Sequence, residues 1–315
     1  MIAAMTTAHG THDYAEDPRN FSVLVSLNGR LVPRPEAVVS VFDAGFVLGD
    51  GVWEGIRVTD GHPAFLEQHL DRLYEGAAAI ALDIGRSRQE LTEEIYRLLR
   101  ANEMTGSGVH VRLMVTRGQK STPYQDPRFS AGPATVAIVA EHKSPLASTL
   151  ENGLTVFTVH VRRPEPDVLD PKLNSHSKLN DILACIQAYT AGADEALMLD
   201  RDGFVATCNS THFFIVRRGE VWTSTGDYCL GGITRRNVLE ICHQAGIPAY
   251  ERRFSLTEVY GSSEAFVTGT FAGVVPVRSV DGRAIGTGTR GPLVERLQSL
   301  YAEHVARDVA RRSAP

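Results

Sequence analysis

The sequence of 315 residues is poor in cysteine and lacks any segment that would export or anchor it. None of its four cysteines, Cys185, Cys208, Cys229 and Cys242, forms a C-x-x-C pair, so reduced thiols are expected in place of disulfides or metal ligands. Residues 1–10 have neither the basic region nor the apolar core of a signal peptide. No apolar run approaches the roughly 18 residues that a membrane span needs. We therefore expect a cytoplasmic protein with no membrane partner.

An excess of positive charge is also missing. Lys and Arg together number 32 and Asp and Glu number 37, which gives a net charge of -5 at pH 7. This balance predicts no nucleic-acid partner. Hydrophobic residues make up 43% and charged residues 22%, as in an ordinary soluble globular protein.

The length of the chain and an aperiodic segment near its middle predict two domains. Residues 1–20 are polar and aperiodic, which indicates a loose tail. We expect a small N-terminal domain at 21–146, a linker at 147–152 and a larger C-terminal domain at 153–315. Strands and helices do not alternate regularly, so the fold class is α+β with a mixed sheet.

Local patterns predict the main elements. Asn28-Gly29 between two apolar runs is typical of a hairpin, and Ser87 followed by Glu90 resembles a capping box. Apolar spacing and turn residues predict helices at 66–81, 87–102, 234–245 and 291–310. Another helix is expected to follow the turn near residue 180 and to end at about residue 192. Alternating or continuous apolar runs predict strands at 51–58, 109–115, 135–139, 154–161 and 265–268.

The chain is organised around residues 168–212, where an extended Asp-Pro segment leads through a turn into a helix and a hairpin. Such an arrangement places polar side chains at the mouth of a sheet, where a small charged ligand binds. Farther on, Gly231-Gly-Ile-Thr234 opens a helix whose free N–H groups favour an anion. Gly269-Thr270 offers a second turn of this kind, and Arg72 offers a guanidinium.

These segments resemble the class IV aminotransferases of fold type IV, which use pyridoxal phosphate. The resemblance covers about residues 23–301 and is carried by Gly49-Asp-Gly-Val-Trp-Glu54, His69-Leu-Asp-Arg-Leu73, Gly232-Ile-Thr-Arg235 and Val267-Thr-Gly-Thr270. It implies a small α/β N-terminal domain, a larger mixed-sheet C-terminal domain, a homodimer, and a small amino acid or keto acid as substrate. The family's cofactor-binding positions correspond to Arg72, Gly232, Ile233, Thr234, Gly269 and Thr270.

The resemblance fails where the family places its Schiff-base lysine. Asn174 occupies that position, and asparagine cannot form an imine. Lys178 lies four residues further on, where an early helical turn would bring its ammonium to the same space. Lys172 lies two residues back; the alternative is that both are solvated surface lysines.

A second departure concerns the ring of the cofactor. The family places a glutamate against the pyridine nitrogen, and Thr207 occupies that position here, so the negative charge is missing. His212 stands where the family usually has asparagine. We expect His176 and Cys208 to lie near this turn as well, and for this group hydrogen bonding to a ligand or proton transfer is favoured over metal binding.

The substrate end also departs from the D-amino acid branch of the family, which grips the carboxylate with an arginine and a histidine after a Thr-Arg-Gly strand end. Thr116-Arg-Gly118 is present, but that pair is absent from the following loop, where Lys120 or Tyr124 is left as a substitute. Substrate hand and side chain stay open.

We hypothesise a class IV aminotransferase-like enzyme that binds pyridoxal phosphate and acts on a small amino acid or amine. Lys178, Asn174, Thr207 and His212 are its candidate catalytic positions. The alternative is an enzyme or pseudoenzyme of the same fold that does not use the cofactor covalently and binds a phosphorylated or carboxylated small molecule instead.

Overall fold

The computed structural model describes residues 10–313, which form two compact units. Unit 1 contains residues 10–15, 145–172 and 179–304, and unit 2 contains residues 16–144, 173–178 and 305–313. The short segment 173–178 therefore belongs with the N-terminal half of the chain, although the segments on either side of it belong to unit 1.

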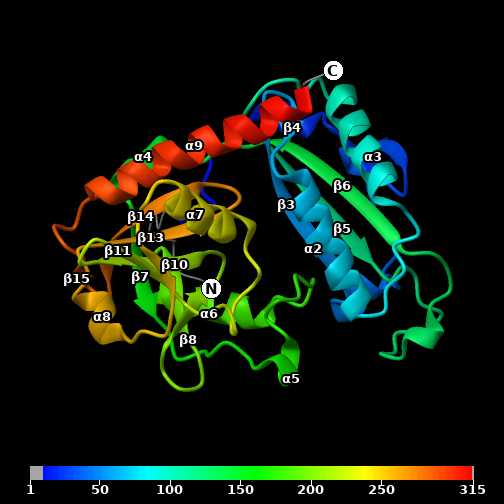
Figure 1. The fold of residues 1–315 in the computed structure, drawn as a ribbon. Helices are drawn as coiled ribbons and strands as arrows, with labels where there is room; N and C mark the ends of the chain where they lie inside the picture. The colour runs from blue at the N-terminus through cyan, green and yellow to red at the C-terminus, as the bar shows by residue number, and fades with distance from the viewer. Residues whose placement is uncertain (1–9, 314–315) are drawn as a thin grey trace. The chain divides into compact units, whose positions relative to one another are not determined.

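Unit 2 is built on an antiparallel sheet of six strands, as far as residues 10–313 show, in the order β2-β1-β6-β5-β3-β4 (Figure 1). The strands are β1 (Leu24–Leu27), β2 (Arg30–Pro33), β3 (Gly51–Thr59), β4 (His62–Pro63), β5 (Val109–Thr116) and β6 (Thr135–His142). The helices are η1 (Pro18–Phe21), η2 (Arg34–Glu36), α1 (Ala44–Leu48), α2 (Leu66–Ala79), α3 (Arg88–Ala101) and η3 (Pro127–Phe129).

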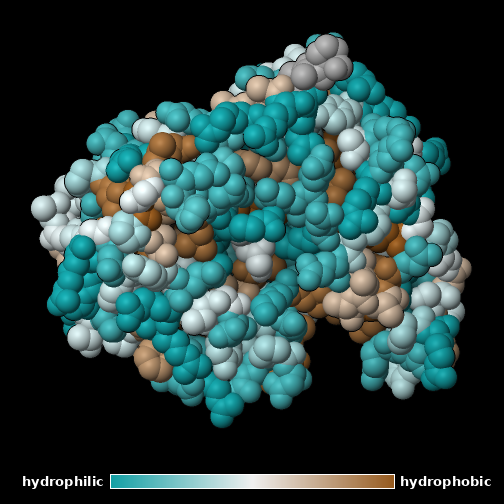
Figure 2. Space-filling model, in the orientation of Figure 1, coloured by the Kyte–Doolittle hydropathy of each residue, from teal (hydrophilic) through white to brown (hydrophobic). Residues whose placement is uncertain are grey.

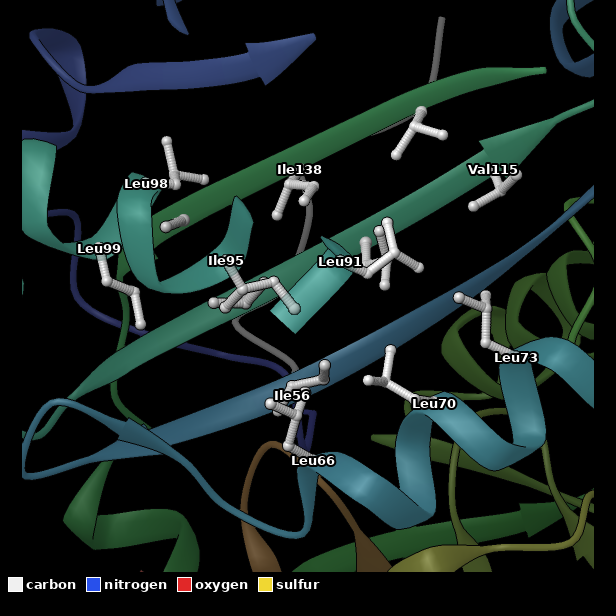
Figure 3. Close-up of a cluster of buried hydrophobic side chains, with 14 of the residues drawn as sticks. Ile56, Leu66, Leu70, Leu73, Leu91, Ile95, Leu98, Leu99, Val115 and Ile138 are labelled. Atoms are coloured by element: carbon white, nitrogen blue, oxygen red, sulfur yellow. The ribbon is translucent and has the colours of Figure 1, made fainter. Parts of the chain in front are cut away.

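Helices α2 and α3 cover one face of this sheet, and their apolar side chains interlock with those of the strands (Figure 3). Helical spacing places Leu66, Leu70 and Leu73 of α2 on one side of that helix. The cluster continues through Leu91, Ile95 and Leu98 of α3 and through Ile56, Val115 and Ile138 of the sheet. Burial of each such side chain contributes about 1.5–3 kcal/mol.

Unit 1 holds a mixed sheet of nine strands within the described part of the chain, in the order β12-β11-β10-β13-β14-β7-β8-β9, with β15 paired to β14. Its strands are β7 (Leu154–Thr158), β8 (Glu195–Leu199), β9 (Val205–Cys208), β10 (His212–Arg217), β11 (Glu220–Thr223), β12 (Ala249–Glu251), β13 (Glu264–Gly269), β14 (Gly273–Val280) and β15 (Arg283–Ala284). Its helices are α4 (Ala147–Asn152), α5 (Pro166–Leu169), α6 (Leu179–Thr190), α7 (Ile233–Gln244), α8 (Leu256–Tyr260) and α9 (Pro292–Ser313), the last of which enters unit 2 at residue 305.

Helix α7 packs on the face of the sheet formed by β10 and β13. The rings of Phe214 and Phe266 stack with centroids 4.7 Å apart beneath it. Val238 and Ile241 of α7 join the same buried cluster. This packing fixes the N-terminus of α7 beside the ends of both strands (Figure 1).

Most predicted elements are confirmed. The hairpin turns at Asn28-Gly29, and Ser87 and Glu90 form the capping box of α3. Two expectations are wrong. The predicted linker 147–152 is helix α4. The side chain of Gln298 donates a hydrogen bond to the carbonyl of Leu150, so this helix is held by a contact with α9.

The predicted loose tail is also wrong for residues 10–20; residues 1–9 lie outside the described part of the chain. Thr11 and Asn20 are buried. The amide of Asn20 donates to the carbonyl of His142 and accepts from its backbone N–H, so the side chain acts as one more rung beside β6. Such long-range pairing leaves no local signature in the sequence.

All four cysteines are free thiols, and Cys185 alone of them is exposed. No helix between residues 10 and 313 has both the length and the apolar character to traverse a lipid bilayer. Polar side chains cover most of the face drawn in Figure 2, with smaller apolar patches between them.

Candidate functional site

Residues 174–176 pair with the start of β3 as a short extra strand of unit 2. Ser175 forms a bridge opposite Val52, the carbonyl of Asn174 accepts from the N–H of Trp53, and the N–H of His176 donates to Gly51. Opposite residues of an antiparallel pair project to the same side. Asn174 and His176 therefore share the face of Trp53, which is the face opposite to α2 and α3.

Lys178 contacts Asn174, although not through the expected early helical turn, because α6 begins at Leu179. Its Nζ donates to Asn174 Oδ1 at 3.2 Å and lies 5.4 Å from the centroid of the Trp53 ring. Asn174 is buried, and its Nδ2 donates to the Trp53 carbonyl at 2.6 Å. Lys172, the other flanking lysine, is exposed.

Arg112 brings a second cation to Trp53, and the sequence analysis missed it. Its guanidinium carbon lies 3.7 Å from the centroid of the Trp53 ring. Arg112 stands opposite Gly55 in the pairing of β3 with β5, so it shares the face of Trp53. The available signal was the alternation along β5, where His110 and Arg112 interrupt a run of buried valines and leucine at every second residue.

His176 lies against Gly51, where a β-carbon would stand 2.7 Å from its Cδ2 atom. Removal from water lowers the pKa of His176, and the charges of Arg112 and Lys178 lower that pKa further against a hydrogen bond to the backbone of Val52. The lowered pKa favours the neutral form of the ring. Its buried Nε2 has no hydrogen-bond partner among the described residues.

The opposite face of the same strand carries a buried charge network. Arg72 donates through Nε and one terminal nitrogen to the two oxygens of Glu54, at 2.7 and 2.6 Å, and His69 Nδ1 lies 2.6 Å from the same carboxylate. Burial alone would raise the pKa of Glu54, but the Arg72 charge and the hydrogen bonds from His69 and Arg72 outweigh it, and the pKa is lowered. Glu54 thus fixes the guanidinium of Arg72 in one orientation.

In unit 1, three predicted site residues, Thr207, Gly232 and Gly269, lie against Thr211 or His212. The hydroxyl of Thr207 donates to the Thr211 carbonyl at 2.8 Å, and a β-carbon at Gly269 would stand 3.2 Å from the Thr211 methyl group. A β-carbon at Gly232 would meet the ring of His212 at 2.2 Å. Thr211, which contacts Thr207 and lies beside Gly269, was not predicted from the sequence.

The ring of His212 is held in one tautomer. Its Nε2 lies 2.7 Å from the carbonyl oxygen of Leu230, which only accepts, so Nε2 carries the hydrogen. Gly232 is the N-cap of α7, and Ile233 and Thr234 begin the helix. The N–H groups of this first turn have no acceptor within the helix, so the site suits an anion. Thr270 follows Gly269 in the turn between β13 and β14, half-buried.

The loop after Thr116 does not present Lys120 as expected. Lys120 is 1% exposed, and its Nζ donates to the backbone carbonyl of Asp126 at 3.0 Å. This contact closes the loop on itself. Tyr124 stays 48% exposed and packs edge-on against Phe129.

The chain contains four lysines, Lys120, Lys143, Lys172 and Lys178. One is buried in its own loop, one is exposed, and Lys178 lies at Asn174. Any covalent chemistry that needs a lysine amine therefore has few candidates. Within residues 10–313, no three His, Cys, Asp or Glu side chains are grouped to hold a metal ion.

Comparisons with known proteins agree with this architecture. The model of the family described as "Amino-transferase class IV" matches residues 51–280. The chain is 41% identical over 284 residues to branched-chain-amino-acid aminotransferase-like protein 2 of Arabidopsis thaliana, covering 90% of this chain and 50% of that protein. It is 35% identical to the branched-chain-amino-acid aminotransferase of Pseudomonas aeruginosa, covering 89% of this chain and 92% of that protein.

Solved structures agree as well. The crystal structure of the branched-chain aminotransferase from Thermoproteus uzoniensis with norvaline has a TM-score of 0.81 and 32% identity, covering 91% of this chain and 96% of that one. The fold is therefore that of the fold type IV aminotransferases. The chain belongs to the class IV aminotransferase family. It spans about half the length of the Arabidopsis thaliana relatives that it matches.

Proposed function

We propose that this protein is an aminotransferase that uses pyridoxal phosphate and acts on a small amino acid and a keto acid. In this proposal, Lys178 supplies the side-chain amine that would hold the cofactor. When bound, the cofactor supplies an aldehyde that carries the amino group and a ring that delocalises electrons from the substrate. A solved branched-chain amino acid aminotransferase of the same fold carries pyridoxamine 5'-phosphate. The remaining work falls to the residues of this chain.

The residues around the N-terminus of α7 fit the phosphate of that cofactor. Gly232 has no side chain, and the His212 ring fills the space in which one would begin. Thr268, which pairs with His212 in the sheet, is fully buried, and its hydroxyl has no partner among the described residues. We propose that Ile233, Thr234, Gly269 and Thr270 supply N–H groups or hydroxyls to this phosphate.

Lys178 carries the proposal. Its amine lies within one hydrogen bond of Asn174, so it reaches the side chain that replaces the expected lysine. The same face holds Arg112, whose guanidinium suits the carboxylate of an amino acid. The ring of His176, whose buried Nε2 has no hydrogen-bond partner among the described residues, suits proton transfer.

Thr207 would meet the ring nitrogen in place of a glutamate. Because its hydroxyl hydrogen is given to the Thr211 carbonyl, its oxygen offers a lone pair and no negative charge. Electron withdrawal by the ring is then weaker than with a carboxylate, so we expect slow turnover.

Borohydride reduction in the presence of added pyridoxal phosphate tests the amine. Peptide mapping by mass spectrometry should find the label on Lys178 and on none of the other three lysines. Lys178→Ala should abolish the label, while the matched variant Lys172→Ala should keep it. Label on another lysine, or an unchanged label in Lys178→Ala, would refute the assignment.

A second candidate is favoured by Asn174 and Thr207 themselves, because both are neutral groups at positions where the family keeps a charged one. In that case the anion site of α7 binds a phosphorylated or carboxylated molecule without covalent chemistry. Wild-type protein that binds pyridoxal phosphate but gives no reducible adduct would support this candidate over the first.

A further inference from the structure

We propose that Asn174 is a positioning residue for Lys178: it aims the amine and, because it is uncharged, adds no negative charge that would hold the proton on that amine. This inference rests on the proposed function, in which Lys178 supplies the reactive amine. Asn174 then does more than mark the place of a missing lysine. It forms one device with the residue four positions later.

The first argument is that Asn174 is held rigidly. Its backbone carbonyl accepts from the N–H of Trp53 at 3.0 Å, and its side-chain Nδ2 donates to the carbonyl of the same residue at 2.6 Å. The side chain is 5% exposed. Two bonds to one residue of β3 leave the amide group a single orientation.

The second argument concerns which end of the amide faces the lysine. The Trp53 carbonyl only accepts, so the NH₂ group of Asn174 must face it, and Oδ1 must face the other way. Lys178 only donates, and its Nζ lies 3.2 Å from Oδ1. Both partners demand the same amide assignment, which makes the contact specific for asparagine at residue 174.

The third argument is electrostatic. The acceptor that residue 174 offers the ammonium is a neutral amide, whereas a carboxylate there would stabilise the charged form and raise the pKa of the amine. Arg112 approaches within 3.7 Å of the centroid of the ring that Lys178 also approaches, at 5.4 Å. A second positive charge at this ring disfavours the ammonium. A lysine that must act as a nucleophile needs its neutral form.

Asn174→Asp tests the electrostatic part, since it changes the side chain by one group and adds one charge. Competitive labelling with acetic anhydride in protein without cofactor measures the apparent pKa of Lys178, with exposed Lys172 as the internal reference. We expect that pKa to rise by about 1 unit or more in Asn174→Asp. Borohydride-trapped adduct on Lys178 at pH 7 should then fall by about tenfold, and a higher pH should restore it.

Asn174→Ala separates aim from charge. It should reduce the trapped adduct several-fold without raising the pKa of Lys178 and without restoration at high pH. Circular dichroism and thermal melting establish that both variants are folded; if Asn174→Ala is not, Asn174→Ser serves in its place. Equal Lys178 pKa values and equal adduct yields in wild type, Asn174→Asp and the truncated variant would overturn the proposal.

The double variant Asn174→Lys with Lys178→Ala helps to distinguish failure of the proposed function from failure of the inference about Asn174. If trapping moves to residue 174 in that variant, the surrounding site supports an amine there. If wild-type protein traps no adduct on Lys178, the proposed function fails. The labelling pKa in Asn174→Asp still decides whether Asn174 controls Lys178, since it needs no cofactor.

Discussion

The ring of His212 occupies the space in which a side chain at Gly232 would begin, since a β-carbon there would stand 2.2 Å from Cε1 of the imidazole. A bond from Nε2 to the Leu230 carbonyl holds the ring in place. Residues 212 and 232 therefore depend on each other. This dependence lies at the N-cap of α7, where the proposed phosphate site begins.

Gly232→Ala should destabilise the protein and weaken anion binding. The added methyl group must displace His212 or the first turn of α7, and overpacking of this kind costs about 1–3 kcal/mol. Chemical denaturation measures the stability, and fluorescence titration with pyridoxal phosphate measures the affinity.

The double variant Gly232→Ala with His212→Ala is the matched control, because removing the ring makes room for the methyl group. Once His212 is alanine, adding Gly232→Ala should lower the stability much less than it does in the wild-type protein. Strictly additive losses would show that the ring does not oppose the added carbon.

Glu54→Gln should destabilise unit 2 strongly. The carboxylate is fully buried, and its loss removes a negative charge that both Arg72 and His69 contact at 2.6 Å. Removing one partner of a buried ion pair costs about 3–5 kcal/mol. Urea denaturation at pH 7 gives the difference; Glu67→Gln, on the exposed side of α2, is the control and should change little.

The pH dependence of that difference has a fixed sign. The pKa of Glu54 in the folded protein is lowered below its ordinary value of 4.5. Its stabilisation is therefore fully present above about pH 5 and is lost as the pH falls through the folded pKa. Wild type and Glu54→Gln should converge in stability in acid; a gap that widens as the pH falls would contradict the ionised state of Glu54.

We predict that helix α6 lies at the interface of the expected homodimer. Four apolar residues at helical spacing are exposed along it: Leu179 at 66%, Ile182 at 51%, Leu183 at 46% and Ile186 at 47%. An apolar stripe of this kind marks an interaction surface. Leu183→Lys should convert a dimer to monomer in sedimentation velocity, while Gln244→Lys, on the polar surface of α7, should not; a monomeric wild type would contradict the expectation.

How far the sequence predicts this protein differs between its elements and its site. Leu66, Leu70 and Leu73 recur at a spacing that only a helix brings to one side, and Asn28-Gly29 fits few backbone turns, so both elements follow from local rules. The glycines before α7 were predicted for the same reason. Asn20, by contrast, reads as part of a polar tail, because its partner His142 lies 122 residues away.

Counting along the chain predicts Asn174 at the position of the family's lysine and Thr207 at that of its glutamate, and both assignments stay predictions. Tertiary structure alone decided what surrounds them. The pairing of residues 174–176 with β3 brings Trp53 under Lys178, and the pairing of β3 with β5 adds Arg112 to the same ring. These contacts depend on strand register between distant segments, which folding sets through the burial of whole faces and which no local pattern encodes.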